Sequence, residues 1–217
     1  MTQDPPSAQV FQHQDVQYIA QESLYQGFTQ LAAVELKHRR FAGGWTPALR
    51  REVLLRPNAV GVLAYDPWRD QVVLVEQFRI GARTDPLSPW LLELIAGLIE
   101  PGEEAEAVAH REAWEEAQLT LLSLEKITRY YSSPGVTDEQ VDLFCALVDA
   151  SQAATLAGLA DEQEDIRVVC LPAAEALQQA LSGRAANAMS LIALHWLALH
   201  APRLKQQAQL LAHHDPA

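Results

Sequence analysis

The segment from Pro101 to Leu119, PGEEAEAVAHREAWEEAQL, constrains the fold more than any other part of this chain. It opens with proline and glycine, carries acidic residues in its first turn, where the helix dipole favours them, and continues through good helix formers without another glycine. The pattern predicts an α-helix. Alanines recur at every fourth position, and such a stripe of small side chains lets the helix lie close to a sheet; they are Ala105, Ala109, Ala113 and Ala117.

Apolar, strand-like runs lie on both sides of this helix. Residues 59–65 and 71–78 predict a hairpin, and Trp90 to Gly97 predicts one buried strand. Further strands are predicted in KITRYY, VDLFCALV and IRVVCLP, and two helices in AAEALQQALSG and NAMSLIALHWLALH. Strands before and after the main helix, with more helices behind them, indicate an α/β sandwich around a mixed sheet.

The first 57 residues follow a different pattern. The runs VQYIA, LAAVELKH and RREVLLR, with a turn at Gly43 and Gly44, predict a small antiparallel β-sheet that Pro57 ends. We therefore expect two domains: an N-terminal β-sheet domain of residues 1–57 and a larger α/β domain of residues 58–217.

The charge balance excludes some partners. With 28 acidic residues against 16 basic ones and a formal net charge of -12, the surface should repel nucleic acid and anionic membranes. The N-terminus has no targeting pattern, and no apolar run is long enough to span a membrane. Cys145 and Cys170 lie in apolar runs, which predicts buried free thiols that suit a reducing compartment. We expect a soluble, cytoplasmic protein.

The predicted helix crowds three carboxylates, Glu112, Glu115 and Glu116, into five positions. Like charges at this spacing destabilise a helix by about 0.2–0.5 kcal/mol per pair, and Arg111 should neutralise only one of them. One explanation is a solvated acidic helix face. The other is a site for a hard cation, since a set of oxygen ligands without histidine or cysteine suits Mg²⁺ or Mn²⁺.

The residues upstream of these glutamates favour the cation site. The string from Gly97 to Leu119 resembles the Nudix box, G-x5-E-x7-R-E-U-x-E-E-x-G-U, and it keeps Gly97, Glu103, Arg111 and the three glutamates at the right spacing. Two positions depart from the pattern. Ala113 is smaller than the usual aliphatic residue, and Gln118 replaces the glycine after the helix. If the chain takes a left-handed cap there, Gln118 costs roughly 1 kcal/mol.

The resemblance implies a fold and a reaction class. Nudix hydrolases are α/β/α sandwiches that hydrolyse a nucleoside diphosphate linked to another moiety, with divalent cations held by the box helix. The segments VEQFRI, PWLLELIAGLIEPGE, SSPG and LADEQEDIRV, and a proline 15 residues after the box at Pro134, resemble the ADP-ribose pyrophosphatases of this family. This implies a homodimer that exchanges its N-terminal sheet domains, and cleavage of ADP-ribose to AMP and ribose 5-phosphate.

The resemblance also assigns roles at the reaction centre. Glu162 would be the general base, and Glu115 would assist the metal ligands. The cation would be Mg²⁺, with Mn²⁺ or Zn²⁺ as alternatives. Four residues would hold it: Ala96 through its carbonyl, and the carboxylates of Glu112, Glu116 and Glu164.

Substrate contacts are implied in the same way. Arg79 would bind the diphosphate, and Phe28 would stack on adenine in a pocket completed across the dimer. The remaining contacts would come from Arg51, Glu52, Leu98, Ser133, Pro134, Gly135 and Glu139. Two alternatives stay open: a pyrophosphatase for another nucleotide sugar, such as GDP-mannose or ADP-glucose, and a non-hydrolysing ADP-ribose sensor. The intact box glutamates disfavour the sensor.

Overall fold

The computed structural model describes residues 10–159, 164–185 and 187–212 of the chain. The chain divides into two compact units. The N-terminal unit contains Met1–Arg56 together with Ser133–Glu139, and the larger unit contains Pro57–Ser132 and Gln140–Ala217.

The N-terminal unit is a three-stranded antiparallel sheet, as the sequence predicts. Its strands run in the order β1-β2-β3, with β1 at Val16–Gln26, β2 at Gln30–His38 and β3 at Leu49–Leu55, after a short 3-10 helix, η1, at His13–Asp15. Gly43 and Gly44 both have positive φ angles, 87° and 73°, in the connection between β2 and β3, which explains why glycine occupies this turn. The Leu54 amide donates to the Val136 carbonyl, which ties the segment Ser133–Glu139 to β3.

The larger unit is built on one eight-stranded mixed sheet. Its central order is β10-β11-β5-β4-β9-β8; β6 pairs with β5, β7 pairs with β4, and β4 runs parallel to β9. The strands are β4 (Ala59–Asp66), β5 (Gln71–Phe78), β6 (Trp90–Glu93), β7 (Ile95–Leu98), β8 (Ser123–Tyr131), β9 (Gln140–Leu147), β10 (Leu156–Ala157) and β11 (Ile166–Pro172).

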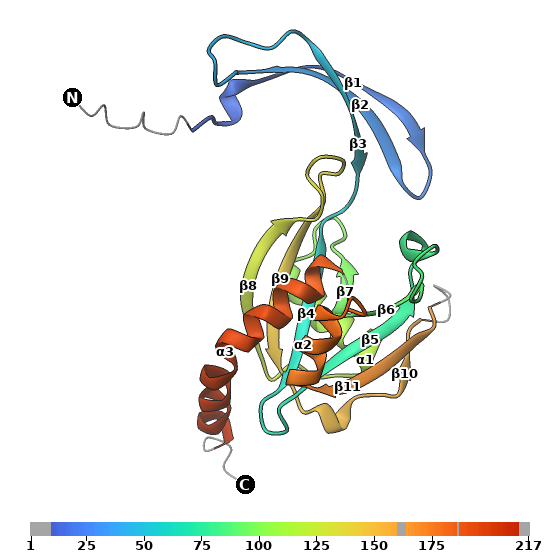
Figure 1. Ribbon diagram of the computed structural model, residues 1–217, viewed down its shortest axis with the longest axis vertical. Helices are drawn as coiled ribbons and strands as arrows, with labels where there is room; N and C mark the ends of the chain where they lie inside the picture. The colour runs from blue at the N-terminus through green and yellow to red at the C-terminus, as the bar shows by residue number, and fades with distance from the viewer. Residues whose placement is uncertain (1–9, 160–163, 186, 213–217) are drawn as a thin grey trace, which may run out of the picture. The chain divides into compact units, whose positions relative to one another are not determined.

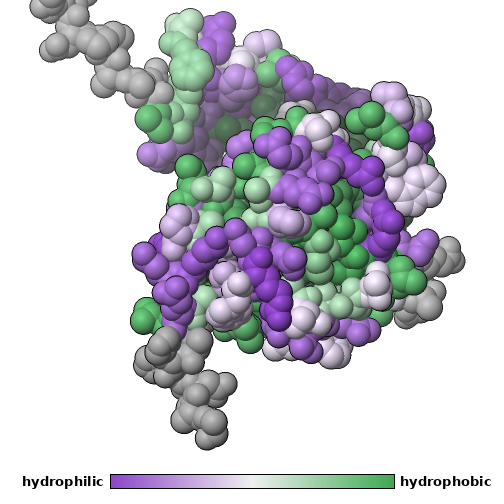
Figure 2. Space-filling view, turned by 60° about the horizontal axis from the view of Figure 1, so that its bottom comes forward, coloured by the Kyte–Doolittle hydropathy of each residue, from purple (hydrophilic) through white to green (hydrophobic). Residues whose placement is uncertain are grey.

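Helices cover both faces of this sheet (Figure 1). Helix α1 (Ala105–Ala117) packs on one face, and α2 (Ala173–Leu181) and α3 (Ala188–Ala212) pack on the other. Two short 3-10 helices, η2 (Ile80–Ala82) and η3 (Ala150–Gln152), lie in connections. The predicted α/β/α sandwich is confirmed. On the molecular face shown in Figure 2, hydrophobic side chains gather in a patch bordered by hydrophilic ones.

Three details differ from the sequence-based expectations. Trp90 to Gly97 is not one strand: β6 pairs with β5 and β7 pairs with β4, so the run changes its partner strand at Leu94. Cys145 is buried as predicted, but Cys170 is exposed; it lies in the part of β11 that extends beyond the two residues paired with β10. Helix α3 continues past His200, through Pro202, to Ala212.

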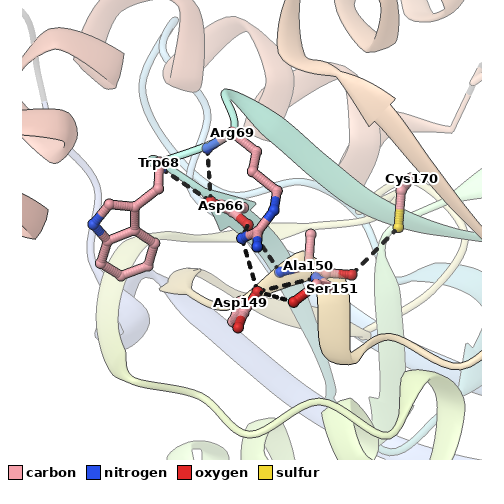
Figure 3. A network of polar contacts seen from close by, with 7 residues as sticks. All are labelled: Asp66, Trp68, Arg69, Asp149, Ala150, Ser151 and Cys170. Atoms are coloured by element: carbon pink, nitrogen blue, oxygen red, sulfur yellow. Dashed lines mark hydrogen bonds and ion pairs between the residues drawn. The ribbon is translucent and has the colours of Figure 1, made fainter.

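A buried aspartate closes the turn between β4 and β5 (Figure 3). Asp66 accepts hydrogen bonds from the backbone amides of Trp68 and Arg69, each at 2.9 Å, and from the Ala150 amide at 3.0 Å. Asp66 also forms an ion pair with the Arg69 guanidinium, which in turn pairs with Asp149. The network lies at the end of β4 opposite to the end that pairs with β7.

Candidate active site

The face of α1 that meets the sheet carries both the alanine stripe and two of the glutamates. Ala109, Ala113 and Ala117 are completely buried, so the predicted close packing is confirmed. Glu112 and Glu116 are only 8% and 3% exposed. A solvated acidic face is therefore the wrong explanation for these two carboxylates, because ionised groups are almost never buried unless paired or bound to a metal.

Strand β7 receives both buried carboxylates. A side chain at Gly97 would place its Cβ 1.8 Å from Glu112 Oε1, so glycine is required for Glu112 to approach the strand this closely. The neighbouring Ala96 amide donates a hydrogen bond to Glu116 Oε2 at 2.9 Å. The structure thus brings three of the predicted metal-site residues, Ala96, Glu112 and Glu116, to one place.

Burial and mutual repulsion perturb these carboxyl groups. Burial raises the pKa of Glu112 to about 7, with Glu115 and Glu164 contributing in the same direction against Arg111. Burial raises the pKa of Glu116 to about 8, where Glu112 and Glu164 add to the rise, and the Ala96 amide and Arg79 oppose it. Carboxyl groups that resist ionisation until a positive charge arrives are a common property of cation-binding and catalytic sites.

Arg111 is shared among the box glutamates. Its Nη1 lies 2.7 Å from Glu112 and 3.0 Å from Glu115, and its Nη2 lies 3.5 Å from Glu103. The expectation that Arg111 neutralises one carboxylate is wrong, because one terminal nitrogen bridges two of them. Its Nη2 also donates to the Leu98 carbonyl, so Arg111 links the helix to the end of β7.

The cap after α1 takes the conformation that the box glycine would provide. Gln118 adopts the left-handed region, with φ 53° and ψ 34°, and its amide bonds back to the last turn of the helix. The chain therefore keeps a left-handed cap although it lacks the glycine, so the condition under which Gln118 is strained is met.

The segment before β11 contributes Glu164. Its amide donates to the Leu159 carbonyl, and Leu159 donates back to the Glu164 carboxylate. Gly158, with φ 101°, lies against the Glu164 side chain and donates to the Glu115 carbonyl at 3.4 Å. This local structure holds Glu164 near enough to α1 to raise the pKa of both buried glutamates. Glu162, the predicted base, lies outside the described residues.

The donor set fits a hard divalent cation. Carboxylate and carbonyl oxygens are the ligands that Mg²⁺ prefers, and a bound cation would relieve the repulsion among Glu112, Glu116 and Glu164. Among the described residues no group of three or more His, Cys, Asp or Glu side chains is already arranged as a metal cluster. Glu112 instead pairs with Arg111, and Glu116 accepts from the Ala96 amide.

Strand β5, the residue after it and the end of β6 add polar groups on the same face of the sheet. The Gln77 amide donates to Glu116 Oε1 at 3.5 Å, and Arg79 Nε lies 2.7 Å from Glu93 Oε2. Sequence reasoning identified Arg79 but missed Gln77 and Glu93. The alternation of side chains along β5 could have indicated Gln77, since it shares a face with Arg79 and with buried Val75.

Leu98, another predicted substrate contact, is the last residue of β7 in the larger unit, and the other predicted contacts lie in the N-terminal unit. Phe28 is 97% exposed, which is unusual for a ring of this size. Glu139 is half-buried and pairs with Arg56 at 3.1 Å. The remaining residues are all exposed: Arg51, Glu52, Ser133, Pro134 and Gly135.

Fold and site together define an α/β/α protein in which helix α1 presents two buried carboxylates to the backbone of strand β7. A family model described as NUDIX domain matches residues 55–192. The chain belongs to this family.

Several known proteins are similar to the chain. The ADP-ribose pyrophosphatase of Escherichia coli (strain K12) is 45% identical over 197 residues, covering 91% of this chain and 94% of that protein. The one from Haemophilus influenzae is 43% identical over 201 residues, covering 91% and 93%. The GDP-mannose pyrophosphatase of Salmonella arizonae is 35% identical and covers 68% and 77%.

A solved structure titled ADP compounds hydrolase shares the fold, with a TM-score of 0.63 and 21% identity, covering 87% of this chain and 97% of that one. Within the described residues, none of the helices has the length and apolar character needed to cross a membrane.

Proposed function

We propose that this chain hydrolyses ADP-ribose to AMP and ribose 5-phosphate by attack of water on the diphosphate. The observation that carries the proposal is the pair of buried glutamates, Glu112 and Glu116, held against β7 at Gly97 and Ala96. Relatives named ADP-ribose pyrophosphatase support the substrate, since they match at 43–45% identity over 91% of the chain. Relatives named GDP-mannose pyrophosphatase match at 34–35% over a shorter part.

The proposed cation is Mg²⁺. When bound, it would neutralise charge on the diphosphate and acidify the attacking water. Glu162 is the proposed base that accepts a proton from that water, and Glu115 is the proposed assistant, already oriented by Arg111. The proposed ligands are Ala96, Glu112, Glu116 and Glu164.

Arg79 is the proposed diphosphate cation, since a guanidinium matches phosphate oxygens with two parallel hydrogen bonds. Phe28 is proposed to stack on adenine, and its exposure leaves the ring free for that contact. The Leu98 backbone would also line the substrate. Polar contacts to the adenosine and the terminal ribose are proposed for Arg51, Glu52, Ser133, Pro134, Gly135 and Glu139.

We further propose that the chain acts as a cytoplasmic homodimer, with the sheet of residues 1–57 serving dimerisation and substrate contacts and residues 58–217 carrying the chemistry. Exposed apolar side chains on β1, among them Tyr18, Ile19 and Tyr25, support the dimer.

The test is hydrolysis of ADP-ribose, ADP-glucose and GDP-mannose at millimolar Mg²⁺, with products separated by chromatography. Glu162→Gln and Glu116→Gln should each lose about 10²-fold or more in kcat. Glu106→Gln, in the exposed first turn of α1, is the matched control and should keep wild-type activity.

If ADP-ribose is cut best, to AMP and ribose 5-phosphate, the proposal holds. A higher kcat/KM for GDP-mannose or ADP-glucose would keep diphosphate hydrolysis as the reaction but reject ADP-ribose as the preferred substrate. Tight ADP-ribose binding without any hydrolysis would favour the sensor instead.

A further inference from the structure

Glu93 is a buried carboxylate at the end of β6 with both oxygens engaged. Oε2 accepts from Arg79 Nε at 2.7 Å, and Oε1 accepts from Asn187 Nδ2 at 2.7 Å. Asn187 is itself fixed, because its side-chain oxygen accepts from the Ser190 amide at the start of α3. The Glu93 carboxylate is therefore held on one side by the helix start and contacts Arg79 on the other.

The strand register places this contact on the face of the sheet that α1 covers. Glu93 lies opposite Val75, whose side chain packs in the cluster beneath α1. Because side chains alternate along β5, Gln77 shares the face of Val75. Arg79 follows the last residue of β5, and its extended backbone, with φ -124° and ψ 116°, continues the alternation. Gln77 reaches Glu116 directly. Arg79 thus has one carboxylate partner in Glu93 and lies within electrostatic reach of a second, Glu116.

The geometry of the contact decides which nitrogens of Arg79 remain available. Glu93 takes Nε, and neither terminal nitrogen has a hydrogen-bond acceptor among the described residues. A guanidinium binds phosphate oxygens through a pair of parallel N–H groups. An arginine held at Nε keeps the N–H groups of its two terminal nitrogens for a ligand. Glu93 therefore fixes one edge of the guanidinium and leaves its terminal nitrogens open.

We propose that Glu93 is a positioning residue that orients Arg79 for the diphosphate of the substrate. The inference rests on the proposed function, in which Arg79 binds that diphosphate. Glu93 does not contact the substrate; it acts through Arg79, and Asn187 supports it from the start of α3.

The competing explanation is that Glu93 only stabilises the fold, and Glu76 provides a matched control. Glu76 is also a buried glutamate, on the neighbouring strand β5, and it pairs with Arg167 and Arg184. It lies opposite Leu92, which packs in the cluster of α2 and α3. Glu76 therefore has similar burial and pairing on the face of the sheet away from α1.

The experiment compares Glu93→Gln, Glu76→Gln, Arg79→Ala and the double variant Arg79→Ala/Glu93→Gln. Glutamine keeps the size of Glu93 but loses its charge, so the KM for ADP-ribose should rise about tenfold or more. The kcat should change less than about threefold, as expected when binding is lost equally in ground and transition states. Glu76→Gln should keep the wild-type KM, although thermal unfolding should show that Glu93→Gln and Glu76→Gln are both destabilised.

Three further measurements separate positioning from folding. In the Arg79→Ala background, Glu93→Gln should add nothing to KM, because the residue through which it acts is gone. Calorimetric titration of ADP-ribose in EDTA should show weaker binding by Glu93→Gln, with no metal involved. Asn187→Ala keeps the Glu93 charge but removes its support, and should raise KM by a smaller factor.

An unchanged KM in Glu93→Gln, or an equal rise in Glu76→Gln, would overturn the inference. So would additive effects in the double variant. If Arg79→Ala itself keeps the wild-type KM while ADP-ribose is still hydrolysed, the positioning role fails and the proposed reaction survives. If the wild-type chain does not hydrolyse ADP-ribose, the proposed function fails, and calorimetry alone decides whether Glu93 orients Arg79 toward the ligand.

Discussion

At Gly97, the missing side chain decides where the Glu112 carboxylate lies. Gly97→Ala would place a methyl group 1.8 Å from Glu112 Oε1, inside any allowed contact, so Glu112 must move away from β7. Displacing a reacting group by about 1 Å costs on the order of 10²-fold in rate. We expect kcat/KM for ADP-ribose to fall by about 10²-fold or more.

Gly81→Ala is the control for that loss, because a Cβ at Gly81 meets nothing within 4 Å and its φ angle is not in the left-handed region. It should keep wild-type activity. If Gly97→Ala also keeps it, the placement of Glu112 against the strand does not matter for catalysis.

Gln118 carries strain that glycine would remove. A non-glycine residue in the left-handed region costs roughly 1–2 kcal/mol, whereas glycine adds about 0.4–1 kcal/mol of entropy to the unfolded chain. The first effect is larger, so Gln118→Gly should raise the free energy of unfolding by about 0.5–1 kcal/mol.

Urea denaturation measures the Gln118→Gly change, and Gln118→Val, with a branched side chain at the same backbone angles, should shift stability in the opposite direction. Lower stability in the glycine variant would show that the Gln118 side chain makes a compensating contact.

Helix α1 stabilises the fold through its alanines and destabilises it through its glutamates. In the unfolded chain Glu116 titrates near its ordinary pKa of 4.5, and burial raises its pKa to about 8 in the folded protein. Between these values the folded protein holds a proton that the unfolded chain has released. The stability of the metal-free protein should therefore fall as the pH rises from about 4.5 to about 8, and then level off.

Glu116→Gln tests this dependence, because glutamine resembles the protonated side chain. In EDTA, the variant should be more stable than the wild type near pH 8, and the difference should shrink toward pH 4.5. Urea midpoints across this range give the comparison, with Glu106→Gln as the exposed control on the same helix. A difference independent of pH would mean that Glu116 is ionised in the folded protein.

Helix α1 and its glutamates could be predicted because their signals are local: first-turn acids, an alanine repeat and fixed box spacings. Strand partners depend on residues far apart in the sequence. The change of partner at Leu94 therefore has no local signal. The same holds for Glu93, whose contacts with Arg79 and Asn187 span 14 and 94 positions. Pro202 normally ends a helix, yet α3 continues, since Leu204 and Ala208 beyond it are buried.

For the whole molecule, the net charge of -12 opposes the approach of an anionic substrate. Affinity for a diphosphate must therefore come from local positive charge, which makes Arg79 and a bound cation more important than they would be on a basic protein.

The sheet of the N-terminal unit leaves many apolar side chains exposed, more than its own small core can bury. Along β1, every residue after Val16 is exposed, including Tyr18, Ile19 and Tyr25. Monomeric proteins rarely leave such side chains exposed together without a partner, and the proposed partner is a second copy of the chain. Burial of one such side chain contributes about 1.5–3 kcal/mol to dimer stability. Because a twofold interface contains each residue twice, one substitution changes two contacts.

Ile19→Glu and Tyr25→Glu should therefore shift the chain from dimer to monomer, because each removes apolar contact and places a carboxylate in the interface. Sedimentation velocity over a range of concentrations gives the mass. Leu199→Glu, at an exposed leucine of α3, is the control and should stay dimeric. If the wild-type chain sediments as a single copy at every concentration, or both β1 variants stay dimeric, the sheet is not the dimer interface, and the exposed side chains of β1 must serve another contact.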